Sequence, residues 1–256
     1  MQRSLRHQTI IRSVSGQAAA VAVDDLARLT GASAVTIRRD LAELEARGLL
    51  LRTRGGAARA RKRGAPMPFS VRFEADQERK ALIAAAAAGL IEDDDSVIID
   101  NGTTCFAVAQ ALAGRRLTAL ALSLHAAGAL AARPGPSVVV PGGPVATDSL
   151  AFVGDAALQA VREMRVDAVV LGACSASPEH GLTSTTFDDA SLKRACLASA
   201  NRRILVTTPD KLARTSTFRF GSLEDLTHLV TTADAPAEVL EAFREHAVEV
   251  VAVGGD

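Results

Sequence analysis

A helical repeat of apolar residues over residues 34–47 is the most regular pattern in the chain. Ile37, Leu41 and Leu44 recur at helical spacing, which predicts a helix that turns these side chains into a core. At about 100° per residue, the opposite face carries small and basic side chains, namely Val35, Arg38, Arg39 and Ala42. Adjacent arginines on a face of small residues suit a DNA groove, because guanidinium groups bind guanine edges and phosphates bidentately.

A shorter helix is predicted just before this one. Asp24 is placed to cap its first turn, Leu26 gives it an apolar side, and Gly31 supplies backbone freedom where the chain reverses. Ser33 then caps the helix over residues 34–47. A further helix over residues 2–15 is predicted to complete a three-helix unit. Its expected inward side chains are Leu5, Ile10, Ile11 and Val14. Its polar residues Arg3, Arg6 and His7 would lie either near a DNA backbone or on a solvated face.

A pattern typical of a basic β-hairpin follows these helices. Gly48 is expected to end the helix in a left-handed conformation. Residues 49–51 and 52–54 are predicted to pair as strands, closed by Gly55 and Gly56. A helix-turn-helix followed by a basic wing favours DNA binding. The predicted DNA contacts are Ser33, Val35, Thr36, Arg38, Arg39, Arg52 and Arg54. The alternative is a structural helical hairpin with solvated arginines.

From residue 69 onward, helices alternate with short β-branched strands. This alternation predicts an α/β fold with a mostly parallel sheet that is covered on both faces. The expected domains are a winged helix-turn-helix over residues 1–57, a basic Pro/Gly linker over residues 58–68 and a larger α/β domain over residues 69–256. The basic cluster of the linker would either follow DNA phosphates or keep the linker soluble.

Charge is divided unevenly between these parts. Residues 1–63 carry 13 Lys/Arg against 5 Asp/Glu, and the rest carries 16 against 24, so a basic head with charge +8 is joined to an acidic body with charge −8. This division predicts an anionic partner for the head. The three cysteines form no CxxC or Cys/His cluster, so we expect no disulfide, no metal and no cofactor. Residues 1–20 lack a continuous apolar run, so we expect a cytoplasmic protein without a signal peptide or membrane span.

Loops at the predicted carboxyl ends of the strands carry the candidate ligand-binding residues, since ligands of open α/β sheets bind there. The first loop is Asp100-Asn101-Gly102-Thr103-Thr104, whose glycine, hydroxyls and helix start could hold a phosphate. The same residue types would also suit a capped strand–helix turn. Gly142 and Gly143 could bring backbone close to a ligand or simply turn, and Lys211 could meet an anion.

The motif from Ser33 to Leu41 (SAVTIRRDL) and the segment from Arg52 to Ala57 (RTRGGA) resemble the DeoR family of bacterial transcription regulators. The resemblance continues through Arg72, Lys80, the loop from Asp100 to Thr104, Gly142-Gly143, Lys193 and Lys211. It implies a sensor domain similar in fold to ribose-5-phosphate isomerase. Such a domain binds a phosphorylated sugar without converting it, through Asp100, Asn101, Gly102, Thr103, Thr104, Gly142, Gly143 and Lys211.

Three positions depart from the family pattern. Ala121-Leu122 stand where the family usually has Thr-Asn, Cys174 replaces a small or polar residue, and Thr208 replaces an Asp ahead of the lysine. These changes predict a less polar rim for the effector pocket.

The leading hypothesis is a repressor of a carbohydrate catabolic operon that binds double-stranded operator DNA as a homo-oligomer. A phosphorylated sugar would change its operator affinity. One alternative is a sugar-phosphate isomerase, with a carboxylate base among Asp100, Glu179, Asp188 and Asp189 and with Lys211 as the cation. The other is a DNA-binding oligomer whose second domain senses nothing.

Overall fold

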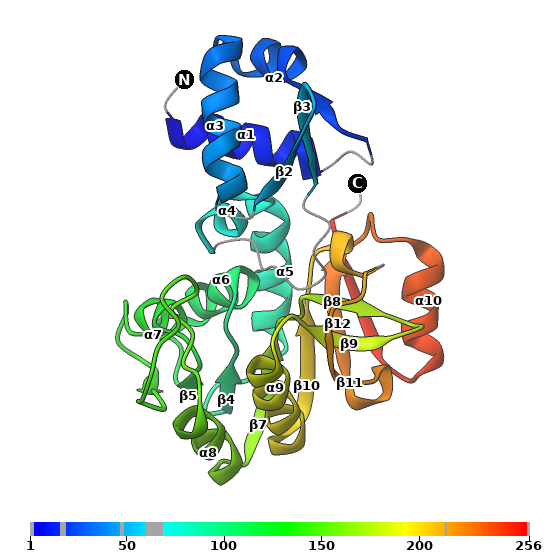
Figure 1. Ribbon diagram of the computed structural model, residues 1–256. Helices are drawn as coiled ribbons and strands as arrows, with labels where there is room; N and C mark the ends of the chain where they lie inside the picture. The colour runs from blue at the N-terminus through cyan, green and yellow to red at the C-terminus, as the bar shows by residue number, and fades with distance from the viewer. Residues whose placement is uncertain (1–2, 16–18, 47–48, 60–68, 213, 255–256) are drawn as a thin grey trace. The chain divides into compact units, whose positions relative to one another are not determined.

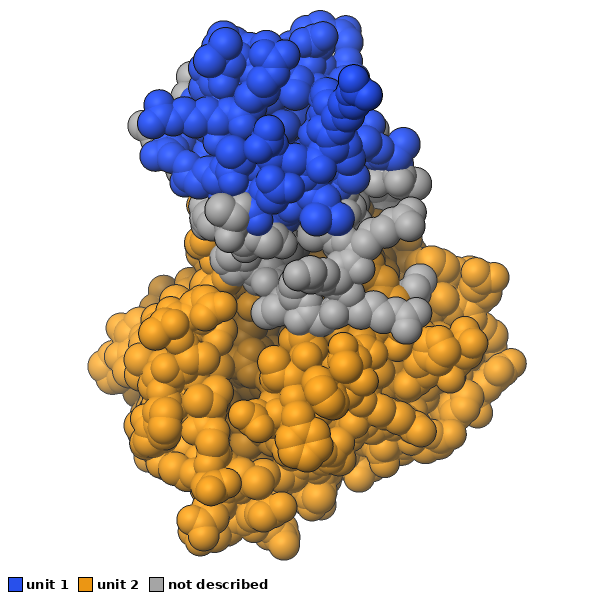
Figure 2. Space-filling view, viewed as in Figure 1, with its two compact units in different colours: residues 1–67 blue, residues 68–256 orange. Residues whose placement is uncertain are grey.

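The computed structural model describes residues 3–15, 19–46, 49–59, 69–212 and 214–254. The chain forms two compact units, Met1–Met67 and Pro68–Asp256 (Figure 2). Most of the predicted linker lies outside the described residues. The strand that ends the first unit continues to Arg59, so Ala58 and Arg59 belong to that strand.

The first unit combines three helices with a small antiparallel sheet of strand order β1-β3-β2. Its helices are α1 (Arg3–Ser15), α2 (Val23–Thr30) and α3 (Ala34–Ala46), and its strands are β1 (Val21–Ala22), β2 (Leu50–Thr53) and β3 (Gly56–Arg59). Side chains from all three helices are fully buried between them, including Ile10, Leu26, Ile37 and Leu44.

Two local predictions for the helices of this unit were wrong. Helix α2 begins at Val23 after Ala22, so Asp24 lies within its first turn and caps nothing, although its charge still suits the positive end of the helix dipole. Leu5 is 54% exposed and does not enter the core. Gly31 takes the expected left-handed conformation, with φ of 68°. Gly48 lies outside the described residues.

The two paired strands of the wing are not the segments that the sequence predicted. Leu50 to Thr53 form one continuous strand, which pairs with Gly56–Arg59 rather than folding back on itself. Strand β1 adds a third strand by pairing Val21 with Ala57. A Cβ at Gly56 would lie 2.1 Å from the Val21 carbonyl oxygen, so glycine is needed where β1 crosses β3.

The second unit is built on a seven-stranded sheet with the order β13-β12-β10-β7-β4-β5-β6, parallel throughout. The strands are β4 (Ser96–Ile99), β5 (Thr118–Ala121), β6 (Ser137–Val139), β7 (Val166–Leu171), β10 (Ala200–Val206), β12 (His228–Thr232) and β13 (Glu249–Val253). The predicted α/β class with a parallel sheet is therefore confirmed.

Helices cover both faces of this sheet and bury two apolar cores (Figure 1). One face carries α5 (Gln77–Gly89), α6 (Thr103–Leu112) and α7 (Leu124–Leu130), while the other carries α8 (Asp155–Glu163), α9 (Phe187–Ser199) and α10 (Ala237–Glu245). A short helix α4 (Phe69–Glu74) precedes α5. A separate antiparallel sheet contains β8 (Ser175–Ser177), β9 (Gly181–Ser184) and β11 (Phe218–Gly221). Two 3₁₀ turns complete the unit, η1 (Pro209–Lys211) and η2 (Leu223–Asp225).

The strand order reverses direction next to β4. From β4 the chain adds β5 and β6 on one side, and then β7, β10, β12 and β13 on the other. The carboxyl ends of β4 and β7 therefore flank a topological switch point, where the crevice of an open α/β sheet usually binds its ligand.

Candidate functional site

Helix α3 presents a basic surface because its apolar residues are held in the core. Ser33 Oγ accepts a hydrogen bond from the Thr36 backbone N–H at 3.2 Å, which caps the start of the helix. Ile37, Leu41 and Leu44 are at most 1% exposed, as the sequence pattern predicted. On the opposite face Val35 is 73% exposed, and Arg38 and Arg39 are also exposed.

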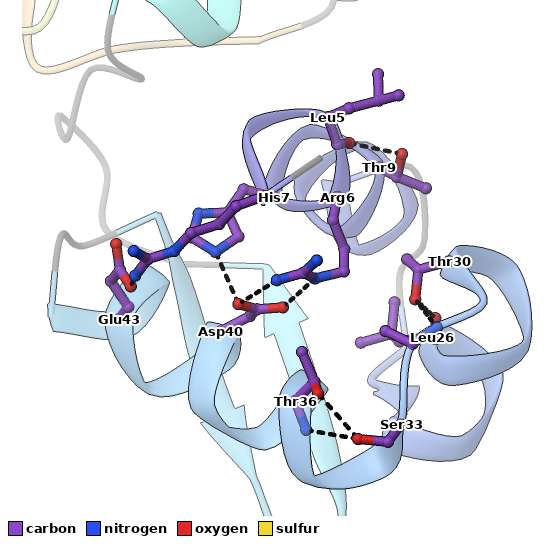
Figure 3. A network of polar contacts seen from close by, with 12 residues as sticks. Leu5, Arg6, His7, Thr9, Leu26, Thr30, Ser33, Thr36, Asp40 and Glu43 are labelled. Carbon is purple, nitrogen blue, oxygen red and sulfur yellow. Dashed lines mark hydrogen bonds and ion pairs between the residues drawn. The ribbon is translucent and has the colours of Figure 1, made fainter. Parts of the chain in front are cut away.

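A buried polar network fixes α3 against α1 (Figure 3). Asp40 is 3% exposed and accepts hydrogen bonds from Arg6 Nε at 2.6 Å and Arg6 Nη2 at 3.2 Å. Its Oδ1 also lies 3.0 Å from His7 Nε2. Burial acts to raise the pKa of Asp40, but the bonds from Arg6 and His7 outweigh it and hold the pKa below its usual value. Arg6 and His7 therefore orient the exposed helix from within the unit, a role that the sequence did not reveal.

The wing places two more arginines on the surface of the first unit. Arg52 lies on β2, Arg54 lies in the turn that follows, and both side chains are exposed. The Arg52 backbone N–H donates to Glu45 Oε1 at 2.9 Å, which ties the wing to the end of α3. The cap, the exposed face of α3 and the wing thus carry the seven predicted DNA-contact residues on one small unit.

In the second unit, a buried charge network lies under the predicted effector loop. Asp100 follows β4 and is 0% exposed. Its Oδ2 accepts from the Gly172 N–H at 2.9 Å, which links the ends of β4 and β7, and from Lys193 Nζ. Burial raises the pKa of Asp100, and Lys193 offsets part of that rise. Burial lowers the pKa of Lys193, but the charges of Asp100 and Asp189 outweigh it and raise that pKa.

Asn101 extends this network towards α9. Its Nδ2 donates to Asp189 Oδ1 at 2.9 Å and to Asp100 Oδ1 at 3.2 Å. Asp189 also accepts from Ser184 Oγ and lies 3.5 Å from Lys193 Nζ. These bonds engage both carboxylates of the network, and Asp100 is fully buried within it.

The loop then opens into the start of α6. Gly102 is the N-cap residue with φ of 105°, a conformation that side-chain-bearing residues rarely adopt. As a glycine, Gly102 has no side chain with which to cap this helix start. Thr104 Oγ1 is buried and has no hydrogen-bond partner within the described part of the chain. The helix start thus offers N–H groups and an unused hydroxyl at the switch point.

Arg72 lies beside this helix start, and Lys80 and Lys211 lie close enough to influence each other's charge. Arg72 Nη1 lies 3.8 Å from the position that a Cβ on Gly102 would take. Burial and the charge of Arg72 lower the pKa of Lys211, and burial and the charge of Lys211 lower the pKa of Lys80 to about 8. Among the residues that the structure describes, the Lys211 ammonium makes no hydrogen bond or ion pair. The lowered lysine pKa values reflect positive charge concentrated where little water and few carboxylates compensate it.

Arg72 and Lys80 were not among the predicted ligand-binding residues. Lys80 Nζ donates to the backbone carbonyls of Arg72 and Ala75, so it also holds the end of α4 in place. Lys80 directly precedes the apolar, alanine-rich run of α5, and this was the available sequence signal for a buried charge. Gly142 and Gly143 have φ of 75° and 81° and follow β6, the edge strand two positions from β4.

The three departures from the family pattern have distinct structural positions. Leu122 is fully buried in an apolar core, so it lines no pocket rim. Thr208 is 3% exposed, and its Oγ1 donates to Asp210 Oδ1 at 2.6 Å. Cys174 Sγ lies 3.9 Å from Ser184 Oγ, beside the charge network.

Two further properties of the described residues concern metals and membranes. They contain no group of three or more His, Cys, Asp or Glu side chains that could hold a metal ion. None of the helices within the described ranges is long and apolar enough to cross a membrane.

Comparison with known proteins identifies both units. Residues 6–63 match the DeoR-like helix-turn-helix domain, and residues 75–233 match the DeoR C-terminal sensor domain. The glycerol-3-phosphate regulon repressor of Haemophilus influenzae is 31% identical over 256 residues, which covers 100% of this chain and 99% of the relative. The transcriptional repressor AccR of Agrobacterium fabrum is 34% identical over 201 residues, 78% of each chain.

Among solved structures, ribose 5-phosphate isomerase A from Methanocaldococcus jannaschii aligns with a TM-score of 0.40 and 16% identity, over 54% of this chain and 56% of that chain. This similarity is too low to carry an inference about activity. The two domain matches and the full-length relatives show that the chain is a DNA-binding transcription regulator that belongs to the DeoR family.

Proposed function

We propose that this regulator represses transcription from an operator and that a phosphorylated sugar or polyol changes its operator affinity. The matched relatives are named repressors, one of them of a glycerol-3-phosphate regulon. Operator DNA in a bacterium lies in the cytosol, so the proposed function places the protein there.

The proposed DNA surface is the exposed face of α3 together with the wing. Arg38 and Arg39 would enter the major groove, where arginine bonds guanine edges or phosphate. Val35 would lie against base edges, and Ser33 and Thr36 would lie near phosphate at the helix start. Arg52 and Arg54 of the wing would contact the backbone beside the groove.

The observation that carries the effector proposal is Arg72 beside Gly102 at the start of α6, with two more cations close to it. Lys80 bonds the Arg72 carbonyl, and the charge of Arg72 lowers the pKa of Lys211. A phosphate dianion would compensate that charge and accept bonds from the N–H groups at the helix start, where the helix dipole also favours an anion.

The other predicted effector residues take supporting positions in this proposal. Asn101, Thr103 and Thr104 would surround the phosphate through backbone N–H and hydroxyl groups. Asp100 would hold the loop in place through Gly172 and Lys193. Gly142 and Gly143 would border the sugar on the side of β6.

An isomerase is the less supported alternative. Isomerisation requires a carboxylate free to take a proton from a sugar carbon. Asp100 is fully buried, and both Asp100 and Asp189 are bonded to neighbouring side chains that include Lys193. These bonds favour a binding site over a catalytic one.

The Gly102→Val substitution tests the proposed phosphate site. The φ of 105° would be strained by a side chain, and the added atoms would point towards Arg72. We expect sugar phosphates to bind the native protein more tightly than the same sugars without phosphate. We expect roughly tenfold or greater loss of that binding in the variant, the scale of losing charge-assisted hydrogen bonds. Isothermal titration calorimetry with a panel of phosphorylated and unphosphorylated sugars measures both effects.

Gly114→Val is the matched control for this substitution. Gly114 also has a positive φ, 90°, but it lies before β5, at the amino end of the sheet. The control should lose similar stability and keep the ligand. Equal affinity for sugars with and without phosphate, or full binding in Gly102→Val, would place the effector elsewhere.

A further inference from the structure

A pocket lined by arginine and serine lies between α8 and α9, which pack side by side (Figure 1). Its volume is about 360 Å³, within the range of pockets that hold small ligands. Its polar lining residues are Arg162, Arg165, Ser191, Arg194 and Ser199, alongside two alanines of α9. We refer to it as the α8–α9 pocket.

The α8–α9 pocket is separate from the proposed effector site. Arg165 directly precedes β7, whereas the switch point lies beyond the end of that strand. A strand of six residues spans about 20 Å. The two sites therefore lie towards opposite ends of β7.

No carboxylate lines the α8–α9 pocket in the part of the chain that the structure describes. Its lining contains three arginines and no acidic residue. Elsewhere in the unit, arginines commonly pair with acids, as Arg115 does with Asp93, Arg116 with Asp94 and Arg202 with Asp95. Within the described residues, Arg162, Arg165 and Arg194 form no ion pair.

Hydrogen bonds to neutral groups hold two of these arginines in place. Arg165 Nη1 donates to the carbonyl oxygens of Arg162 at 3.0 Å and Met164 at 2.8 Å. Arg194 donates to the Arg219 carbonyl at 2.6 Å and to Ser191 Oγ at 3.1 Å. These acceptors order the guanidinium groups without neutralising them, and each guanidinium keeps further N–H donors for a ligand.

We propose that the α8–α9 pocket is a second anion site, which binds a small molecule carrying phosphate. Forked guanidinium groups match the oxygens of a phosphate, and Ser191 adds a hydroxyl group near them. The Ser199 hydroxyl donates to the Val161 carbonyl at 3.0 Å and so helps to hold α9 against α8. The proposal rests on the charge and lining of this pocket and is independent of the proposed effector site. Because α9 also supplies Asp189 and Lys193 to the network under the effector loop, occupancy of the pocket acts on the helix that supports that loop.

Calorimetric titration of the full chain with inorganic pyrophosphate tests this proposal. The titration is made in the Gly102→Val background, so that the effector loop contributes little, and at constant ionic strength. We expect saturable binding of one pyrophosphate per chain. The double variant Arg162→Gln/Arg165→Gln should weaken it roughly tenfold, as expected when charge-assisted hydrogen bonds are lost. Glycerol 3-phosphate and inorganic phosphate, titrated in parallel, distinguish a phosphorylated metabolite from the free ion.

Two more variants complete the design. Arg116→Gln/Arg244→Gln removes two exposed arginines that pair with acids, and it should leave pyrophosphate binding unchanged. Ser191→Glu places a carboxylate among the three arginines and should abolish the binding while Arg162 and Arg165 remain. The proposal is overturned if no saturable binding occurs, or if Arg162→Gln/Arg165→Gln binds pyrophosphate as tightly as its parent. It is also overturned if those variants reduce only the affinity for double-stranded DNA.

Discussion

At the scale of single residues, the charge states of Lys80 and Lys211 connect the structure to the proposed ligand. Burial and neighbouring positive charge lower both pKa values, that of Lys80 to about 8. Each lysine therefore loses its proton more readily in the folded protein than in water. A bound phosphate dianion would reverse this effect by stabilising the ammonium forms.

Effector affinity should consequently fall as the pH rises through about 8. Below that pH the free protein already carries the protonated Lys80 that a phosphate prefers, whereas above it binding must take up a proton. One such proton gives at most about a tenfold change in affinity per pH unit. Calorimetry in two buffers of different ionisation enthalpy measures the proton uptake. Lys80→Arg keeps the charge at all these pH values and should flatten the profile, and an equally steep profile in that variant would exclude Lys80 as the cause.

Replacement of Arg38 or Arg39 by Ala should weaken operator binding by ~1–3 kcal/mol if the side chain makes a good base-edge contact. Both arginines are exposed on α3, so the fold should not change. Selection of bound duplexes from random DNA supplies the operator, and fluorescence anisotropy gives the affinities. Arg12→Ala removes an exposed arginine near the end of α1 and serves as the control. Unchanged operator affinity in both single variants would assign DNA recognition to other residues.

At the scale of elements, long periodic patterns in the sequence allowed helices and strands to be predicted, whereas short strands could not be predicted. Ile37, Leu41 and Leu44 predicted the buried face of α3, and the alternation of helix and strand predicted the parallel sheet. Strands β8 and β9 have only three and four residues, and no pattern predicted them because segments so short carry little periodicity. Their pairing with β11 depends on contacts distant in sequence.

The same distinction holds for the candidate sites: features that are local in sequence were predictable, and contacts between distant residues were not. The loop around Gly102 was visible as a strand–glycine–helix pattern, since such a turn is local in sequence. The approach of Arg72 to that loop and the Arg6–Asp40 bonds join residues about thirty positions apart, so no local pattern could indicate them. The partners of Asp100, Gly172 and Lys193, could not be predicted either, because they are distant in sequence and only the fold brings them together.

The Asp40→Asn substitution tests the link between α1 and α3. It keeps the shape of the side chain but removes the charge that Arg6 and His7 bond, which should cost about 2–3 kcal/mol of stability in the first unit. Operator affinity should fall as well, because α3 loses its fixed orientation. Thermal unfolding and anisotropy measure the two effects. Glu43→Gln removes an exposed pair with Arg3 between the same two helices, and it should cost under about 1 kcal/mol. Similar losses in both variants would contradict a special role for the buried network.

At the scale of the whole molecule, the uneven distribution of charge agrees with DNA binding by the first unit. The excess of positive charge lies in the unit that carries the DNA-binding helix, while the second unit is acidic and repels DNA phosphates. The proposed effector site and the proposed DNA surface lie on different units. Binding at one site would therefore change the affinity of the other through thermodynamic linkage. A ligand that lowers operator affinity by some factor must bind the DNA-free protein more tightly by the same factor.

We expect the protein to act as a homo-oligomer, at least a dimer. One winged helix contacts one half-site, and a two-fold protein matches a palindromic operator. A candidate contact is β6, an edge strand of the large sheet whose Val139, with the adjacent Val140, is more than 40% exposed. Exposed apolar edge strands tend to pair with another chain. Analytical ultracentrifugation should give a mass of at least twice 26.6 kDa for the native chain.

The double variant Val139→Lys/Val140→Lys should shift that mass towards the monomer, because it places two charges on the edge that would pair. Operator affinity should fall with it, since each half-site would then bind separately. Ala131→Lys/Ala132→Lys, on exposed residues after α7, supplies the same charge as a control. A native chain that is monomeric both free and on DNA would refute the oligomer, and a variant that remains oligomeric would place the contact on another surface.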